Sequence, residues 1–275
     1  MGRDFRQPRS NPGTPLSTHV IVTAALAPLV SEPSTRAEQV SQLRLGDTAA
    51  LLGERGEWRR VRMDRDGYEG WVHHGYLLPV AAARATEWRL RAQGWSEGAT
   101  VGVDGRTLRL PLGARVELDD GGVVLPDGRR GVVTGGAVLP YAEVVREALR
   151  VTPDRWALEH FDGAPYLWGG VTPWGVDCSG LVQTTFAARG IALPRDSVQQ
   201  AELGIEIPRE AARPGDLLFF SERGDRITHV AFVGEDDTLV HSTLACGGFT
   251  AETWAECDRA GFLRGRLVAV RRIEG

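Results

Sequence analysis

Cysteine is scarce in this chain, with three residues among 275: Cys178, Cys246 and Cys257. An odd number without any C-x-x-C pair argues against both a disulfide framework and a zinc ribbon. Cysteines that remain thiols are typical of a reducing compartment. We therefore expect a cytoplasmic protein, with export to the cell envelope as the alternative.

An excess of basic residues is also missing. The chain has 32 Lys and Arg residues against 36 Asp and Glu residues, which gives a formal net charge of -4 at pH 7. Binding to nucleic-acid phosphates needs clustered basic surface, and arginine pairs such as Arg59-Arg60 and Arg271-Arg272 are too short to supply it. We therefore expect no nucleic-acid partner.

The chain has no hydrophobic run long enough to suggest a membrane span. The apolar stretch over 20–30, VIVTAALAPLV, is interrupted by Thr23 and Pro28 and is far shorter than the ~20 residues that a spanning helix needs. Arginines precede it, as in a secretory signal, but SEPS follows in place of a small-x-small cleavage site. A core strand explains the stretch equally well, so we expect no membrane span.

The amino-terminal half has the pattern of small β modules. Residues 1–16 are rich in Pro, Gly and Arg and predict a loose tail. Short apolar runs separated by turn signals occupy 17–80 and 85–140, which predicts two small β modules, each a barrel or a small sandwich. A weak repeat supports this reading, because LRLG at Leu43 recurs as LPLG at Leu110, and DGYEGWV recurs as DGRRGVV.

The pattern changes to α+β from residue 141 onward. Helical periodicity covers 141–150 and 155–161. Runs rich in Val, Leu and Phe then predict four strands, at 216–220, 228–234, 238–242 and 267–273. We assign 141–275 to one domain, and every catalytic candidate lies in it.

Cys178 lies where a turn leads into a helix. Leu181, Val182 and Phe186 follow at helical spacing, Gly190 is placed to end the helix, and we expect the helix to be amphipathic. A thiol at a helix N-terminus faces the positive end of the helix dipole, which favours the thiolate. A buried, inert cysteine is the alternative, and the position alone does not decide between the two.

Two histidines strengthen the case for Cys178. His229 and His241 lie in apolar runs joined by GEDDT, a hairpin turn. If the hairpin is centred at Glu235, the two histidines are directly opposed, with Cβ atoms roughly 4.5–5.5 Å apart. One imidazole would then deprotonate the thiol and the other would orient the first.

Zinc is the chemical alternative at these residues. Cys178, His229, His241 and Cys246 offer ligand atoms, but no chelating spacing is present. The adjacent His73 and His74 fall in an expected turn and predict a solvated surface. We therefore expect neither a metal nor any other cofactor.

Several separate blocks resemble the NlpC family of cell-wall cysteine peptidases in order and spacing. They are PYLWGG, DCSGLVQTTF, LPRDSVQQ, RPGDLLFF and ITHVAFVG with LVHS, over about 155–245. The modules before them resemble bacterial SH3-like barrels, and the combination resembles two-barrel γ-D-glutamyl-L-diamino acid endopeptidases. The second module departs from the first, because Arg129, Arg130 and Val132 replace Tyr68, Glu69 and Trp71.

The resemblance implies a papain-like catalytic domain with Cys178 as nucleophile, His229 as base and His241 as orienter. It also implies that the Tyr166 hydroxyl lies near the oxyanion position, where it and the backbone N–H of Cys178 can donate to the developing charge. Packing of Tyr166 against Trp168 is the alternative role for this side chain.

The resemblance further implies a pocket for the L-Ala-D-Glu part of a murein stem peptide. Asp177, Ser179 and Ser197 match positions that line it, and Glu38 and Tyr68 of the first barrel match positions that close it. A carboxylate beside the nucleophile, such as Asp177, can pair with a free α-amine. Capping of the helix by Asp177 is compatible with that role.

The sequence therefore predicts a thiol hydrolase that cuts the γ-D-glutamyl–diamino acid bond of murein peptides with a free N-terminal L-Ala, in cell-wall recycling. A non-catalytic wall-binding protein is one alternative. An acyltransferase on the same scaffold is another, because an amine can capture the thioester in place of water.

Overall fold

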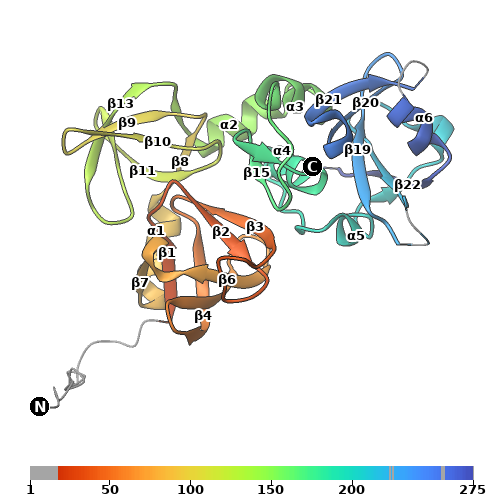
Figure 1. Ribbon diagram of the computed structural model, residues 1–275. Coiled ribbons are helices and arrows are strands. Elements are labelled where there is room, and N and C mark those ends of the chain that lie inside the picture. Colours follow the sequence, from red (N-terminus) through yellow and green to blue (C-terminus); the bar gives the residue numbers. More distant parts are fainter. Residues whose placement is uncertain (1–17, 223, 225, 255–257, 275) are drawn as a thin grey trace, which may run out of the picture.

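A computed structural model describes residues 18–274 except 223, 225 and 255–257. The expected tail over 1–16 and Cys257 lie outside the described residues. Two barrel-like sheets and an α+β domain follow one another along the chain (Figure 1). No helix among the described residues combines the length and the apolar content needed to cross a membrane.

The first barrel is one antiparallel sheet in the order β3-β2-β6-β5-β4-β1-β7. Its strands and short 3-10 helix are β1 His19–Val22, β2 Leu26–Val30, β3 Gln39–Arg44, β4 Thr48–Arg55, β5 Trp58–Met63, β6 Glu69–His73, η1 His74–Tyr76 and β7 Leu77–Val80. The apolar stretch over 20–30 therefore forms two strands. Val20, Val22, Ala27 and Leu29 from them are buried in the barrel core.

Helix α1 (Ala82–Arg91) joins this barrel to the second, whose order is β10-β9-β13-β12-β11-β8-β14. Its strands are β8 Gly94–Ser96, β9 Thr100–Val103, β10 Arg106–Arg109, β11 Arg115–Asp119, β12 Gly122–Val124, β13 Arg130–Gly135 and β14 Val138–Pro140. Adding seven to each strand number of the first barrel gives this order. The two modules therefore share one connectivity, as the weak sequence repeat predicts.

The two repeated L-x-L-G turns contact each other across the barrels. Gly46 and Gly113 both have positive φ, at 84° and 81°. A Cβ on Gly46 would collide with the carbonyl of Arg115, and a Cβ on Gly113 would collide with the Arg44 guanidinium. Glycine is therefore needed at both turns for backbone conformation and for close approach.

The third domain is built on a sheet in the order β17-β22-β18-β19-β20-β21. Its elements are α2 Tyr141–Ala148, α3 Pro153–Phe161, β15 Val171–Thr172, β16 Gly175–Val176, α4 Cys178–Ala188, α5 Ser197–Gln200, β17 Ile205–Glu206, η2 Arg209–Ala211, β18 Leu217–Phe220, β19 His229–Val233, β20 Thr238–Thr243, η3 Leu244–Cys246, β21 Gly248–Thr253, α6 Asp258–Arg264 and β22 Leu267–Arg272. All four predicted strands are present, and the sequence analysis missed β17 and β21 of this sheet.

Alternating side chains of this sheet bury two apolar faces. Phe219, Val230 and Phe232 pack with α2, α3 and α4 on one face. Phe220 and Ala231 face the other way and pack with Ala260 and Leu263 of α6. Figure 1 shows α6 and α3 on opposite sides of β19 and β20.

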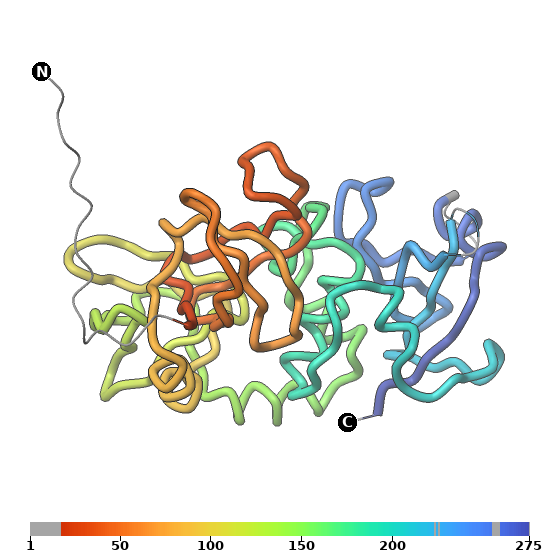
Figure 2. The backbone as a smooth tube through the Cα atoms, turned by 90° about the horizontal axis from the view of Figure 1, so that it is seen from below, coloured from red at the N-terminus to blue at the C-terminus, as the bar shows by residue number. Residues whose placement is uncertain are grey.

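Each of the two barrels contributes a side chain to the core of the domain that follows it. Leu45 of the first barrel is buried in the core of the second, and Trp95 of the second barrel is buried in the core of the third domain. The Gln39 and Gln42 amides also bond to the backbone of Trp168 and Val171, at 2.8 and 3.1 Å. In the perpendicular view the first barrel accordingly lies beside the green segment of the third domain (Figure 2).

Candidate active site

Cys178 is the first residue of α4, and Asp177 caps this helix. Asp177 Oδ1 accepts a hydrogen bond from the backbone N–H of Gly180 at 2.7 Å. A Cβ on Gly180 would collide with the carbonyl of Gly170, so the first turn is held against the preceding loop. Gly190 ends the helix at φ 81°, as expected.

The expectation of an amphipathic α4 is wrong. All residues from Cys178 to Phe186 are buried, as is Ala188. The helix packs against β19 and β20 and against α2 and α3. Its polar residues, such as Gln183 and Thr184, face neighbouring protein segments and make hydrogen bonds there, so a periodic polar stripe does not mark a solvent face here.

Asp177 forms a buried ion pair with Arg195, at 2.5 Å between Oδ2 and Nη2. Oδ2 also accepts the N–H of Gly169 at 2.8 Å. Arg195 Nη1 donates to the Ser179 hydroxyl at 2.8 Å. Both carboxylate oxygens of Asp177 therefore already have partners, and the sequence analysis missed Arg195 although it follows a quoted Leu-Pro pair.

The surroundings of Cys178 favour the neutral thiol. Burial, with Asp177 as second cause, raises the pKa of Cys178 to about 12. The backbone N–H groups of Val230 and Ser179, and the Arg195 charge, oppose this rise without cancelling it. The dipole of α4 therefore does not yield a preformed thiolate, contrary to the expectation from sequence, and the thiol needs a base during the reaction.

Three side chains form a hydrogen-bonded row beside Cys178. His229 Nε2 and His241 Nδ1 are 2.7 Å apart, and His241 Nε2 and Glu252 Oε2 are 2.9 Å apart. A carboxylate only accepts, so His241 Nε2 carries a proton and its Nδ1 accepts from His229 Nε2–H. His229 Nδ1 is then unprotonated and can receive a proton.

The expected register of the histidine hairpin is wrong by two residues. Phe232 pairs with Val240 and Val233 with Leu239, which places Thr243, and not His241, opposite His229. Asp236 and Asp237 both adopt positive φ in the turn, so its centre lies one residue later than expected. The imidazoles still meet because diagonal neighbours on one face of a sheet are within reach of long side chains.

Glu252 is a member of this row that the sequence analysis missed. It lies on β21, where His241 pairs with Thr250, so Glu252 is a diagonal neighbour on the same face. Its second oxygen accepts from the Cys246 thiol at 3.1 Å. The alternation of polar residues in FTAETW was the available signal, but it requires knowing that this segment is a strand.

His229 is held neutral. Burial, then the His241 ring, then the Arg259 charge lower its pKa well below the ordinary 6.5. Tyr166 has a raised pKa, first because of burial and then because of Cys178, so its hydroxyl stays protonated and can donate. Tyr166 and His229 line one cavity together with Cys178.

Two cavities adjoin at Cys178, Trp168 and Thr228. One, of about 410 Å³, is bounded by the first barrel and α5, and the other, of about 640 Å³, is bounded by Tyr166, His229 and η3. Trp168 is 57% exposed and lines both. The thiol therefore lies between two binding spaces, as cleavage of a bond within a chain requires.

The smaller of these cavities is lined by acidic side chains from two domains and by Arg195 and Arg226. Glu38 and Tyr68 of the first barrel line it together with Asp196 and Ser197, so the predicted pocket residues are brought together. The Tyr68 hydroxyl donates to Asp196 Oδ1 at 3.2 Å. Burial, with Asp196 second, raises the pKa of Tyr68 to about 12, which keeps it a donor. Asp196 was missed, although it follows Arg195 in the quoted LPRDS block.

The larger cavity contains an ion pair. Arg259 of α6 donates to both oxygens of Glu222, Nη1 at 2.9 Å and Nη2 at 2.7 Å. Both residues line the cavity together with His229. This side of Cys178 therefore offers a cation and an anion next to each other.

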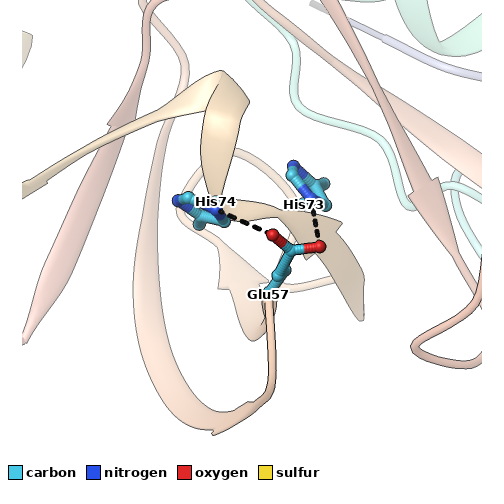
Figure 3. A group of neighbouring side chains, drawn as sticks. All are labelled: Glu57, His73 and His74. Carbon is cyan, nitrogen blue, oxygen red and sulfur yellow. Dashed lines mark ion pairs between the residues drawn. The ribbon is translucent and has the colours of Figure 1, made fainter. Parts of the chain in front are cut away.

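The first barrel carries one surface group with possible metal ligands. Glu57, His73 and His74 have ligand atoms within 4.8 Å of one another (Figure 3). The distances from Glu57 to the two imidazoles, 3.5 and 3.9 Å, are those of ion pairs. All three side chains are at least partly exposed, as the predicted surface position of His73 and His74 requires.

Comparison with known proteins agrees with this arrangement. Residues 163–258 match the NlpC/P60 family and 29–77 match the bacterial dipeptidyl-peptidase Sh3 domain. A gamma-D-glutamyl-L-lysine dipeptidyl-peptidase of Bacillus subtilis (strain 168) is 30% identical over 222 residues, 74% of this chain and 71% of that protein. The probable endopeptidase NlpC of Escherichia coli (strain K12) is 38% identical over 92 residues, 33% of this chain and 60% of that protein.

A solved structure shares the whole fold. The NlpC/P60 family protein from Bacillus cereus ATCC 10987 has a TM-score of 0.73 and 19% identity, over 92% of this chain and 99% of that chain. The family match spans both Cys178 and the His229–His241–Glu252 row, and the Bacillus subtilis relative is matched over more than two thirds of its length. With SH3-like barrels in front of an α+β domain that carries these residues, the chain belongs to the NlpC/P60 family of cysteine peptidases.

Proposed function

We propose that this peptidase hydrolyses the γ-D-glutamyl–diamino acid bond of murein stem peptides whose N-terminal L-Ala is free. The observation that carries the proposal is the cavity beside Cys178, whose lining includes Glu38 and Asp196 from two different domains. Two carboxylates in the lining of a cavity of this size favour a positively charged terminus, whereas a glycan chain would need an open groove.

The chemistry follows from the row of side chains. The Cys178 thiol attacks the γ-carbonyl carbon while His229 Nδ1 takes its proton. The carbonyl oxygen becomes an oxyanion that the Cys178 backbone N–H and the Tyr166 hydroxyl stabilise. His229 then returns the proton to the leaving amine of the diamino acid. Water, deprotonated by His229, hydrolyses the thioester and releases L-Ala-D-Glu.

His241 and Glu252 are positioning residues in this scheme. Through its two hydrogen bonds, His241 holds His229 in the tautomer that leaves Nδ1 open. Glu252 in turn fixes His241 and stabilises positive charge on the row when His229 is protonated. Glu252 is thus a fourth member of the catalytic row, after Cys178, His229 and His241.

We assign the contact with the α-amine to Asp196 in place of Asp177. Asp177 is engaged with Arg195, Gly169 and Gly180, whereas the Tyr68 hydroxyl bonds to Asp196 at the lining of the cavity. Asp177 and Arg195 then support Ser179, which lines the same cavity, and Ser197 borders it from α5. We assign to these hydroxyls the binding of polar groups of the γ-linked glutamate.

The Glu222–Arg259 pair supports a diamino acid on the leaving side. A diamino acid carries both an ammonium and a carboxylate, which match the two charges of this pair. A role in recycling, and with it a cytoplasmic location, is part of the same proposal, because a free L-Ala terminus arises only after the peptide is released from glycan.

The test is a rate comparison by mass spectrometry on L-Ala-γ-D-Glu-diaminopimelate, its N-acetyl form and an intact muropeptide. We expect release of the L-Ala-D-Glu dipeptide from the first substrate, and acetylation to lower kcat/KM roughly a hundredfold or more, the scale of one desolvated charge pair. Equal rates on all three would contradict the closed pocket and recast the barrels as wall anchors.

A further inference from the structure

A third cavity, which is polar, lies where the two barrels and the third domain meet, away from Cys178. It has a volume of about 170 Å³. The first barrel contributes Arg44, Asp47 and Arg65, the second contributes Arg115, and α4 contributes Gln183. The proposed peptidase reaction uses none of these side chains.

Two arginines of this cavity have buried N–H groups without a hydrogen-bond partner among the described residues. They are Nε and Nη1 of Arg44 and Nη1 of Arg115. Arg44 is 5% exposed. A buried donor without a partner costs free energy, and a buried charge costs more, so such groups call for an explanation.

The neighbouring carboxylate balances these charges only in part. Asp47 Oδ2 accepts from Arg65 Nη1 at 2.8 Å and lies 3.8 Å from Arg44 Nε, beyond hydrogen-bond distance. Arg65 also pairs with Asp66, whose Oδ2 accepts from Gln183. Burial, opposed by Asp47 and reinforced by Arg65 and Arg115, lowers the pKa of Arg44 to about 10. A surplus of positive charge therefore remains at Arg44 and Arg115.

The two guanidinium groups are held in place from both sides. The guanidinium carbons of Arg44 and Arg115 lie 5.7 and 5.2 Å from the centre of the Trp95 ring. The guanidinium carbon of Arg115 also lies 3.7 Å from the centre of the Tyr141 ring. Gly46 and Gly113 of the repeated turns let the barrels approach closely at these residues. The donors are thus fixed before any ligand arrives.

We propose that this cavity binds a small tetrahedral oxyanion, such as inorganic phosphate, between Arg44 and Arg115. Guanidinium groups that come from two different barrels suit an ion with several acceptor oxygens. The volume holds several water-sized groups, which fits such an ion with a few waters and excludes a nucleotide. The bound ion would join the first barrel, the second barrel and α4.

The expected consequence for the peptidase rests on the proposed function. Gln183 of α4 bonds to Asp66 of the first barrel at 3.0 Å, and the same barrel supplies Glu38 and Tyr68 to the substrate cavity. An ion that fixes the barrel against α4 lowers KM for the free peptide and leaves kcat unchanged.

The binding itself is tested without any peptide. Calorimetry and thermal unfolding of the full chain are measured with phosphate, with acetate and with chloride at constant ionic strength. We expect saturable phosphate binding, and a rise in Tm of roughly 5 °C at a hundredfold excess over Kd. No binding by the wild-type protein, or equal effects of acetate or chloride, would overturn the assignment.

Two variants locate the site. Arg44→Met removes a buried charge and should abolish the response to phosphate without lowering Tm in its absence. Arg130→Gln, on the exposed face of the second barrel, removes the same charge and should respond as the wild type does. An unchanged phosphate response in Arg44→Met would place the ion elsewhere and overturn the proposal. If Arg44→Met does not fold, Arg115→Met serves in its place, and the wild-type calorimetry still decides.

Discussion

His241 Nε2 and Glu252 Oε2 lie 2.9 Å apart on neighbouring strands, and this contact sets the proton positions of the whole row that ends at His229. Glu252→Gln turns an acceptor that cannot donate into an amide that can, so the tautomer of His241 is no longer fixed. We expect kcat to fall by about 10²- to 10⁴-fold with little change in KM, because Glu252 does not line either cavity beside Cys178. Steady-state kinetics on the free tripeptide measures this.

The control for Glu252→Gln is Cys246→Ser. The Cys246 thiol donates to the other oxygen of Glu252, and a hydroxyl preserves that donor. Wild-type activity is expected for Cys246→Ser. If Glu252→Gln kept wild-type kcat as well, the row would have no role beyond the fold.

Cys178→Ala should abolish hydrolysis, with a loss of about 10⁴-fold or more, while the protein stays folded. Only Cys178 combines the start of α4 with the histidine row. Peptide cleavage and circular dichroism are the measurements, with Cys246→Ala as the comparison that keeps most of its activity. Cleavage by Cys178→Ala together with loss in Cys246→Ala would reverse the assignment of the nucleophile.

The pH dependence should reflect the lowered pKa of His229. The base acts only when neutral, and because burial, His241 and Arg259 lower its pKa, kcat/KM should hold down to well below pH 6.5 before it falls. Arg259→Gln removes one positive neighbour, so the pKa rises and the acid limb should move to higher pH. A pH profile of kcat/KM for both proteins measures the shift. If the acid limb of Arg259→Gln coincided with that of the wild type, the Arg259 charge would not affect the pKa of His229.

Asp196→Asn should remove discrimination for the free N-terminus. We expect kcat/KM on the free tripeptide to fall roughly a hundredfold and that on the N-acetyl peptide to stay the same, because only the charged amine loses its partner. Rates on the matched pair of peptides measure this. A parallel loss on both would mean that Asp196 supports the pocket without contacting the amine.

Asp177→Asn should act on stability. It leaves Arg195, with 2% of its side chain exposed, without its ion-pair partner, so we expect a loss of about 3–5 kcal/mol in the free energy of unfolding. Glu210→Gln, an exposed site in η2, is the control and should change it by less than about 0.5 kcal/mol. Urea denaturation is the measurement, and equal stability of the two variants would contradict a structural role for the pair.

Local sequence patterns predicted much of this molecule. Short-range signals within each segment predicted where α4 begins and ends, four of the six strands of the catalytic-domain sheet, and both small β modules. Side chains that act across segments were harder to predict. Whether His229 opposes His241 or Thr243 depends on two backbone dihedrals at Asp236 and Asp237, which neither hydrophobicity nor spacing specifies.

Arg195, Asp196 and Glu252 were missed for a related reason. Charged residues are mostly exposed, so a lone Arg or Glu in a sequence is expected at the surface. Arg195 becomes identifiable only once Asp177 is known to be buried beside it, and Glu252 only once β21 is placed next to β20. The burial of α4 on all sides was missed because its polar residues find protein partners in place of water.

Because each barrel contributes a core side chain to the domain that follows it, domains of this enzyme cannot be removed or replaced independently. Removing the first barrel would take Leu45 out of the second, and cutting before α2 would take Trp95 out of the catalytic domain. Each cut leaves a void and uncovers apolar surface. The chain should therefore unfold as one cooperative unit. A fusion of the peptidase domain to a different targeting module should be stable only if the side chains that the barrels contribute to its core are replaced.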